Sequence, residues 1–432
     1  MILLQKSLKI AVVTLGCSKN RVDSEHLAAA LISAGHRVAH EPSWKKMDVA
    51  IVNTCGFILD SKKESIDAIL TLLDEKKNGN LKQVIVYGCL AQRYKDELKN
   101  EMNDVDAFFG VASEKQILEF LKTPFSKLTG RFISTPSHYA YLKIAEGCNR
   151  QCSFCAIPGI RGKYISTPEK VLIREAEMLA DKGVKELILI AQDLTYYGLE
   201  VKEKGRFERL INQLCKISGI EWIRLQYGYP AAFPLPLLDL IKDQPKVCNY
   251  LDIPFQHIND RILKSMRRNI TSKQTYALIE KIRRKLPDTA LRTTLISGYP
   301  GETMQEHEEL LSFVKEVRFE RMGVFSYSHE EGTPAFSLND DVVQKEKRRR
   351  VAQIMKAQQK ISSQINQSII GLTIPAICDR LEGEYYICRS QWDSPEIDGE
   401  ILVSQKKKLK QGNIYQIKIT GAFEFDLVGD VL

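Results

Sequence analysis

The sequence predicts an α/β protein in three parts: an amino-terminal parallel α/β sheet, a central barrel or partial barrel of β/α units, and a small carboxyl-terminal β-barrel of OB-like type. Strand-like and helix-like runs alternate in the first segment and again in the middle, which is typical of parallel sheets. After Ser368 the pattern changes to short strand-like runs. The length of 432 residues also exceeds what one hydrophobic core usually organises.

The three domains are expected at residues 8–124, 134–365 and 367–432. The stretch 123–138 is rich in Thr, Ser and Pro, which favour turns, and is interpreted as a linker. The first 138 residues carry a net charge of +3, the centre carries +8 and residues 366–432 carry −3. A basic centre favours an anionic partner such as RNA or a ribonucleoprotein, although a solvated surface would explain it as well.

Three strand-like runs of the first segment each end on a cysteine. They are Ile10–Cys17, Val49–Cys55 and Gln83–Cys89. Because ligands of open α/β sheets bind at the carboxyl ends of the strands, Cys17, Cys55 and Cys89 are expected to converge. One such cysteine would be an ordinary buried residue, but three at equivalent positions favour an iron–sulfur site with three ligands. Polar residues after each cysteine, such as Ser18–Glu25, would open helices whose amino termini favour a thiolate.

The middle segment contains a second group, Cys148, Cys152 and Cys155, with C-x3-C-x2-C spacing. A [4Fe-4S] cluster usually takes four cysteines, so three thiolates leave one iron free to bind a small molecule. Structural zinc fits less well, because no second C-x2-C pair exists to complete a tetrahedron. The remaining alternative is three buried structural cysteines.

Six strand candidates and intervening helical patterns, such as 168–182 and 272–285, predict the central β/α barrel. The strand candidates are Tyr141–Ala145, Glu186–Gln192, Trp222–Gln226, Tyr250–Ile253, Leu291–Ile296 and Met322–Tyr327. Active sites in such barrels lie at the carboxyl ends of the strands, where the cysteine loop, Gln192 and His257 all fall. The glycine-rich Gly298–Thr303 lacks the ending of a phosphate-binding P-loop, and a turn or a ligand contact would both explain it. His257 could equally be a base or a structural residue.

The carboxyl-terminal segment contains about five short strands, among them Thr373–Cys378, Tyr385–Arg389, Gly399–Val403 and Tyr415–Ile419. Its net negative charge and the acidic stretch Asp393–Glu400 argue against a surface that grips phosphates. We therefore expect this barrel to recognise a basic protein partner rather than RNA.

The ten cysteines are too few for a disulfide scaffold, and several lie in apolar runs, which suits a reducing cytosol. Four lack any partner spacing and are interpreted as buried thiols: Cys215, Cys248, Cys378 and Cys388. Lys6 and Lys9 interrupt the apolar start, so neither a signal peptide nor an anchor is expected. No uncharged apolar stretch is long enough to span a bilayer. We expect a cytoplasmic protein that does not engage a membrane.

The Cys148–Cys155 loop resembles the signature of the radical S-adenosylmethionine (SAM) enzymes, with Phe154 matching the aromatic residue that the superfamily places beside the adenine. Nearly the whole chain resembles the methylthiotransferase family within it. Four runs resemble the RimO branch: Leu15–Glu25, Leu251–His257, Glu330–Pro334 and Arg389–Gly399. That branch modifies an aspartate of small-subunit ribosomal protein number twelve. The sister branch, MiaB, modifies an isopentenylated adenosine of tRNA and is the alternative. Ser18 and Tyr299 depart from many relatives without touching a ligand.

The resemblance implies two [4Fe-4S] clusters and SAM, which serves as radical source and methyl donor. One cluster would use Cys17, Cys55 and Cys89 and hold the sulfur, and the other would use Cys148, Cys152 and Cys155 and cleave SAM. Phe154, Ile157 and Gln192 are expected to contact SAM, with no catalytic residue beyond the cluster ligands. The three domains become a methylthiotransferase amino-terminal domain, a radical SAM domain and a TRAM-like barrel.

A saturated carbon beside a carboxylate cannot be deprotonated by any ordinary side-chain base, which fits removal of a hydrogen atom instead. Reduction of SAM needs the low end of the cluster potential range, below the cytosolic thiol poise. A low-potential electron donor such as flavodoxin or ferredoxin, and a sulfur donor, are therefore expected partners. An iron–sulfur scaffold protein that docks on the ribosome without using SAM is the alternative outside the enzyme class.

Overall fold

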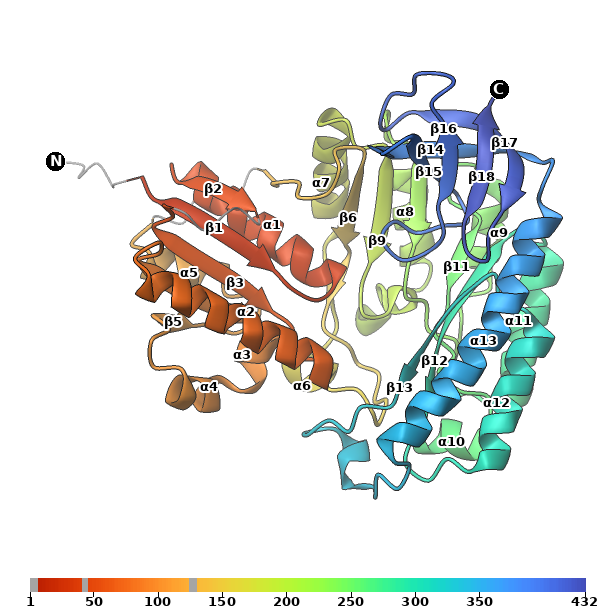
Figure 1. Ribbon diagram of the computed structural model, residues 1–432, viewed down its shortest axis with the longest axis horizontal. Coiled ribbons are helices and arrows are strands. Elements are labelled where there is room, and N and C mark those ends of the chain that lie inside the picture. Colours follow the sequence, from red (N-terminus) through yellow and green to blue (C-terminus); the bar gives the residue numbers. More distant parts are fainter. Residues whose placement is uncertain (1–6, 41–45, 124–129) are drawn as a thin grey trace.

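The computed structural model describes residues 7–40, 46–123 and 130–432. An amino-terminal α/β domain (red to orange) lies beside a larger β/α domain (yellow to cyan), and a small barrel (blue) packs on the end of the latter (Figure 1). The predicted α/β fold class with three parts is confirmed. The boundaries 8–124, 134–365 and 367–432 stay predictions.

The amino-terminal sheet is parallel throughout, with strand order β2-β1-β3-β4-β5. Its strands are β1 (Lys9–Thr14), β2 (Arg37–His40), β3 (Val49–Thr54), β4 (Gln83–Gly88) and β5 (Ala107–Phe108). Continuous runs of buried Val, Ile and Ala form β1, β3 and β4 because helices cover both faces. The strand order reverses between β1 and β3, which is the place where ligands of such sheets bind.

The helices of this domain are α1 (Ser18–Ser33), α2 (Leu59–Lys77), α3 (Cys89–Arg93), α4 (Lys95–Glu101) and α5 (Glu114–Phe120). α1 and α5 share a core with one face of the sheet, and α2, α3 and α4 share a core with the other. The opposite side of α1 is also buried, because Val22 packs against Tyr139, Tyr141 and Ile188 of the second domain. In Figure 1 this helix lies between β1 and β6.

The second domain has two parallel three-stranded sheets, β10-β9-β6 and β11-β12-β13. Their bounds are β6 (Tyr139–Lys143), β9 (Glu186–Ile190), β10 (Trp222–Leu225), β11 (Tyr250–Asp252), β12 (Ala290–Ser297) and β13 (Arg321–Ser326). A single bridge, Ile223 to Val247, links the strand β10 with the residues before β11. All six predicted strands are present and form the partial barrel. The short strands β7 (Ala145–Glu146) and β8 (Ile165–Ser166) pair beside the cysteine loop.

The helices of this domain lie around the partial barrel, and the first of them contacts the amino-terminal domain. They are α6 (Ile157–Arg161), α7 (Glu169–Asp181), α8 (Arg206–Leu214), α9 (Pro236–Asp243), α10 (Asp260–Ser265), α11 (Ser272–Lys285), α12 (Met304–Val317) and α13 (Gln344–Ser368), with 3-10 turns at Leu194–Tyr196, Leu199–Val201 and Pro334–Ser337. The 25-residue α13 runs along α12 and leads to the terminal barrel (Figure 1).

The carboxyl-terminal barrel is closed, with strand order β14-β15-β16-β18-β17. Its strands are β14 (Thr373–Glu382), β15 (Tyr385–Ser390), β16 (Ile401–Ser404), β17 (Ile414–Ala422) and β18 (Leu427–Val431). β16 and β18 are parallel, and the other pairs are antiparallel. The predicted five-stranded barrel is confirmed.

Two carboxylates of the acidic stretch between β15 and β16, Asp393 and Asp398, are buried against the second domain and are not available to a partner. Glu396 and Glu400 of the same stretch keep exposed side chains, and the expectation that the barrel recognises a basic protein stays a prediction. Asp393 is 1% exposed and accepts a hydrogen bond of 2.7 Å from Nε of Arg321 in β13. Asp398 is buried as well and accepts from Tyr250 and Arg292. The sequence pattern shows only the charges. Their partners lie more than 70 residues away, on the strands β11, β12 and β13 of the second domain. The stretch therefore docks the terminal barrel on the second domain.

Part of the linker 123–138 lies outside the described residues. Its far end is fixed, because Arg131 is 2% exposed and contacts Glu25 and Glu175. Cys248, Cys378 and Cys388 are buried as predicted, while Cys215 is only half-buried. Among the described helices, none combines the length and apolarity needed to cross a membrane.

Candidate functional site

The first cysteine group forms at the carboxyl edge of the amino-terminal sheet, as predicted. Cys17 lies at the start of α1, Cys55 directly follows β3 and Cys89 begins α3. Gly16 adopts a left-handed φ of +86°, and a Cβ there would lie 2.6 Å from Cβ and 2.9 Å from Sγ of Cys55. Only glycine lets the two loops approach so closely, so the sequence Gly16-Cys17 brings the cysteines together.

Hydrogen bonds from Asn20 hold these loops in register. Its Nδ2 donates to the backbone carbonyls of Leu15 at 2.9 Å and Thr54 at 3.2 Å. The backbone carbonyl of Asn20 accepts from Nδ2 of Asn53 at 2.8 Å. The thiol of Cys89 lies 3.7 Å from Oδ1 of Asn20. One buried amide thus connects all three strand ends.

The second cysteine group lies on the loop between β7 and α6. The backbone N–H of Arg150 donates to Sγ of Cys148 at 3.4 Å, and Nη1 of Arg268 donates to Sγ of Cys152 at 3.2 Å. The backbone N–H of Ile157 also acts on the Cys155 thiol. Donors directed at sulfur favour thiolates and the anionic groups that thiolates bind.

The first cysteine group contacts α6, the helix that follows the second group. Cys89 packs against Ala156, which directly follows Cys155, and against Ile160 of α6. The Arg161 guanidinium donates to Oδ1 of Asn20 at 2.6 Å. The site is therefore formed by two domains, with α6 supplying the contact between them.

A charged network surrounds this contact. Arg161 pairs with Asp23 of α1 at 3.1 Å and with Glu146 at 2.8 Å, and Lys143 contacts the same two carboxylates. Burial opposes ionisation of Glu146, but Lys143 and Arg161 outweigh it and lower its pKa to about 2. These four groups are largely buried together, and each charge has an opposite partner.

Burial raises the pKa of the Cys89 and Cys155 thiols to about 12 and that of Cys148 to about 11. The pKa of Cys55 is also raised by burial. Without a metal these thiols keep their protons, and binding of iron displaces them.

Among the described residues, no three Cys, His, Asp or Glu side chains converge closely enough to hold one metal ion. A mononuclear zinc site is therefore not indicated. A [4Fe-4S] cluster needs one thiolate on each of three separate irons, and the all-thiol donor sets, with cationic groups close by, fit that requirement.

The residues predicted to contact SAM lie around the second cysteine group. Phe154 packs between two small apolar clusters, one with Tyr229 and one with Tyr299 and Tyr327. Ile157 opens α6 and is half-buried. Gln192 follows β9, its Nε2 lies 3.4 Å from Glu146, and its buried Oε1 has no hydrogen-bond partner in the described part of the chain. An unpaired buried oxygen is a position where a bound ligand would donate.

Two other strand-end features are structural. His257 is fully buried, accepts from the Asn259 N–H at 3.0 Å and lies 3.7 Å from Glu302. Glu302 in turn accepts from the backbone N–H groups of Gly298 at 2.8 Å and Tyr299 at 3.2 Å. The glycine-rich loop therefore binds its own carboxylate, and its N–H groups are not available to a phosphate.

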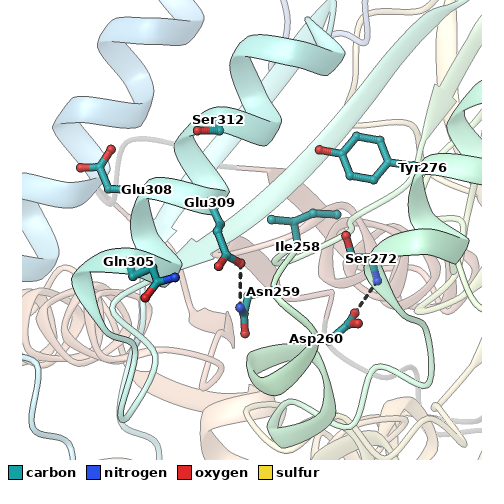
Figure 2. Close-up of a pocket in the computed structure, with 9 residues that line it drawn as sticks. All are labelled: Ile258, Asn259, Asp260, Ser272, Tyr276, Gln305, Glu308, Glu309 and Ser312. Carbon is teal, nitrogen blue, oxygen red and sulfur yellow. Dashed lines mark hydrogen bonds between the residues drawn. The ribbon is translucent and has the colours of Figure 1, made fainter.

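A surface pocket of about 510 Å³ lies elsewhere, on the outer helices (Figure 2). The side-chain amide of Asn259 donates to Glu309, and the Asp260 carboxylate accepts from the backbone N–H of Ser272. The residues around it come from the α10, α11 and α12 region and include neither cysteine group. This pocket is therefore separate from the candidate site.

The sequence pattern did not single out the charged groups that join the two domains: Lys19, Asp23, Lys143, Glu146 and Arg161. Lys19 and Asp23 were interpreted only as polar residues opening a helix. They act through contacts between residues more than 100 positions apart in the sequence, such as Arg161 with Asp23, and local spacing does not reveal such contacts.

Three family profiles match the chain in the order of its domains. They are the Uncharacterized protein family UPF0004 at residues 9–110, the Radical SAM superfamily at 142–314 and the TRAM domain at 370–432. Among solved structures, the radical SAM methyltransferase TsrM from Kitasatospora setae, bound to tryptophan and a SAM analogue, is similar with a TM-score of 0.57 and 13% identity. The alignment covers 87% of this chain and 79% of TsrM. That likeness shows the fold alone.

Sequence relatives are much closer. The ribosomal protein uS12 methylthiotransferase RimO of Cytophaga hutchinsonii is 49% identical over 427 residues, covering 98% of both chains. The RimO of Christiangramia forsetii is 50% identical over 433 residues, covering 99% of this chain and 96% of the relative. At this identity over nearly the full length, the chain belongs to the RimO family of radical SAM methylthiotransferases.

Proposed function

We propose that this protein is an enzyme that methylthiolates the β-carbon of an aspartate in ribosomal protein uS12, with SAM and two [4Fe-4S] clusters as cofactors. The name and near-complete coverage of its relatives support the reaction. The observation that supports the proposal in the structure is the contact of the first cysteine group with α6, the helix that directly follows the second cysteine group. Clusters bound by these two groups would lie in neighbouring domains, which suits a reaction that must generate a radical and deliver sulfur to it in one place.

We assign Cys148, Cys152 and Cys155 to the cluster that binds SAM, and Cys17, Cys55 and Cys89 to the cluster that carries sulfur. When bound, these groups supply the electron, the radical that removes the hydrogen atom, the sulfur and the methyl group. The residues of the chain bind and orient. Arg268 and the Arg150 N–H donate to the thiolates of the second group.

The SAM molecule would lie among Phe154, Ile157 and Gln192, with Phe154 presenting an aromatic face and the Gln192 Oε1 accepting a hydrogen bond. The network of Arg161, Glu146 and Asp23 fixes the separation of the two domains. Because that network and the apolar contact of Cys89 with Ile160 are desolvated, they exclude water from the gap between the two centres.

The proposed partners beyond uS12 are a low-potential electron donor of the flavodoxin or ferredoxin class and a sulfur donor. Substrate and partners of this kind place the reaction in the cytoplasm. The basic centre of the chain would favour approach to the ribosome's RNA, with binding that weakens as salt rises.

The ligand assignment is tested with two triple variants reconstituted without oxygen. Replacing Cys148, Cys152 and Cys155 by Ala should halve the iron content and abolish deoxyadenosine formation from SAM. Replacing Cys17, Cys55 and Cys89 should also halve the iron while SAM cleavage stays measurable. Full iron content in either variant contradicts the assignment.

The substrate is tested by mass spectrometry of cells that lack this protein. We expect the methylthio group to be missing from one aspartate peptide of uS12, with methylthiolated tRNA intact. The reverse pattern would move the assignment to the tRNA-modifying branch. Absence of deoxyadenosine in the reduced wild-type protein would instead favour an iron–sulfur scaffold.

A further inference from the structure

Lys19, the second residue of α1, is an unusual buried cation beside the first cysteine group. It is 8% exposed, yet it makes no ion pair within 4.0 Å and no side-chain hydrogen bond among the described residues. The other buried lysine, Lys347, has a carboxylate partner, Asp340, at 2.6 Å. A buried ammonium without an anion is costly, so a site that keeps one is suited to an anionic ligand.

The aromatic ring of Tyr227 fixes the position of this ammonium. Nζ of Lys19 lies 3.3 Å from the centre of the ring, which attracts the cation without neutralising it. Tyr227 follows β10 and has a left-handed φ of +70°, which is rare for a residue with a large side chain. Hydrogen bonds hold it there: its N–H donates to Asp252 at 3.2 Å, and its carbonyl accepts from the Leu194 N–H at 3.0 Å. Strained residues that are over-determined in this way cluster at functional sites.

The two carboxylates that act electrostatically on Lys19 are paired with other cations. Asp252 and Glu146 both act on its charge from a distance. Asp252 accepts from Arg292 at 3.0 Å, and Glu146 is held by Lys143 and Arg161. Neither of these two carboxylates is therefore available to neutralise the positive charge of Lys19.

The position of Lys19 relates it to the first cysteine group rather than the second. It is two residues from Cys17, and its neighbour Asn20 lies 3.7 Å from the Cys89 thiol. In the proposed function, this is the side from which sulfur reaches the substrate's β-carbon. The target carbon carries a carboxylate one bond away, so an anion must lie close to where Lys19 is held.

Resting on the proposed function, we infer that the unpaired ammonium of Lys19, held on the ring of Tyr227, binds the side-chain carboxylate of the target aspartate. Lys19 is a specificity-determining residue that places the β-carbon between the two cysteine groups. A neutral side chain of the same shape, such as asparagine, would leave the ammonium buried and unpaired. The carboxylate of SAM has the same chemistry, and the experiment distinguishes the two sources.

The test measures the affinity of the reconstituted full-length enzyme for purified uS12 and for uS12 with the target Asp replaced by Asn. The wild type should bind the aspartate form about 10- to 100-fold more tightly, as expected for a charge-assisted contact. Lys19→Met should bind both forms with the same, weakened affinity. The control is Arg21→Met, which removes one positive charge from the same helix at a residue whose partner is Glu396, and it should keep the wild-type preference.

A wild-type enzyme that binds both forms equally overturns the inference without reference to any variant. A Lys19→Met enzyme that keeps the preference overturns it too. A loss of SAM affinity with the preference intact would assign Lys19 to the SAM carboxylate and also overturn it. A wild type that methylthiolates uS12 while Lys19→Met discriminates normally refutes this inference alone, whereas a wild type that leaves uS12 unmodified refutes the proposed function.

Discussion

Removal of the Asp393 carboxylate should undock the terminal barrel from the second domain. Asp393 accepts from Nε of Arg321 at 2.7 Å and from the Ser390 hydroxyl at 2.5 Å, and its side chain is 2% exposed while that of Arg321 is 11% exposed. Asp393→Ala leaves a buried guanidinium unpaired, which costs about 3–5 kcal/mol. At roughly 1.4 kcal/mol per tenfold change, the undocked population should rise by at least about 100-fold.

Glu400→Ala is the matched control for this prediction. Glu400 lies at the end of the same acidic stretch and pairs with Arg380 at 2.7 Å, but the two side chains are 36% and 45% exposed. Its loss removes the same charge and should cost roughly 0–1 kcal/mol, because exposed pairs contribute little.

Hydrogen exchange of the Ser394 amide measures the undocking. That N–H donates to Asp398 at 2.9 Å inside the docked stretch, so it exchanges when the stretch opens. Exchange should be much faster in Asp393→Ala than in Glu400→Ala, with the barrel's own strands unaffected. Equal exchange in the two variants would refute the view that these buried pairs dock the barrel.

Three further outcomes are expected. Gly16→Ala should lower the iron bound by the first cysteine group, measured on the reconstituted enzyme, because its Cβ would collide with Cys55, whereas Gly35→Ala has the same left-handed strain in open space and should keep full iron. Burial opposes ionisation of Glu175, but His26 and Arg131 outweigh it and lower its pKa from 4.5 to about 2. The stability it contributes is therefore present above pH 4.5 and lost as the pH falls toward 2. In Glu175→Gln, the free energy of unfolding of the metal-free chain should consequently fall less steeply with decreasing pH in that window. Deletion of residues 367–432 should lower the unfolding midpoint of the remaining domains in calorimetry, because Arg321 loses its partner.

The sequence predicted the strands and the cysteine positions because both follow from local rules. Strand ends in a parallel sheet converge wherever the apolar runs are clear, so Cys17, Cys55 and Cys89 could be placed at one edge without coordinates. The six strands of the partial barrel could be predicted from the same kind of apolar runs. The assignment of the six cysteines as cluster ligands stays a prediction, and the two triple variants test it.

Long-range ion pairs could not be predicted in this way. Asp393 and Asp398 were interpreted as an exposed acidic surface, because a run of charges is usually solvated and the pattern does not show that Arg321 and Arg292 wait on strands elsewhere. Lys19 was hidden for the opposite reason. A single lysine in a polar helix start looks ordinary until the structure shows that it is buried and that no carboxylate of the described residues pairs with it.

The three domains are joined by charges rather than by apolar surface alone, and this bears on how the site is held. Glu186 on β9 is fully buried and receives both Arg224 of its own domain and Arg389 of the terminal barrel. Glu330 is likewise buried and receives Lys62 and Arg93 of the first domain. Apolar contacts tolerate sliding, whereas a desolvated ion pair loses several kcal/mol when its partners separate.

Such pairs therefore resist rotation of one domain against another. The two cysteine groups belong to different domains, so any rotation would change the gap in which the substrate must react. A radical formed in one domain has to meet sulfur held by the other before it reacts elsewhere, and a displacement on the order of 1 Å can cost about 100-fold in rate. Buried charges at each domain boundary are a physical means of keeping that distance constant.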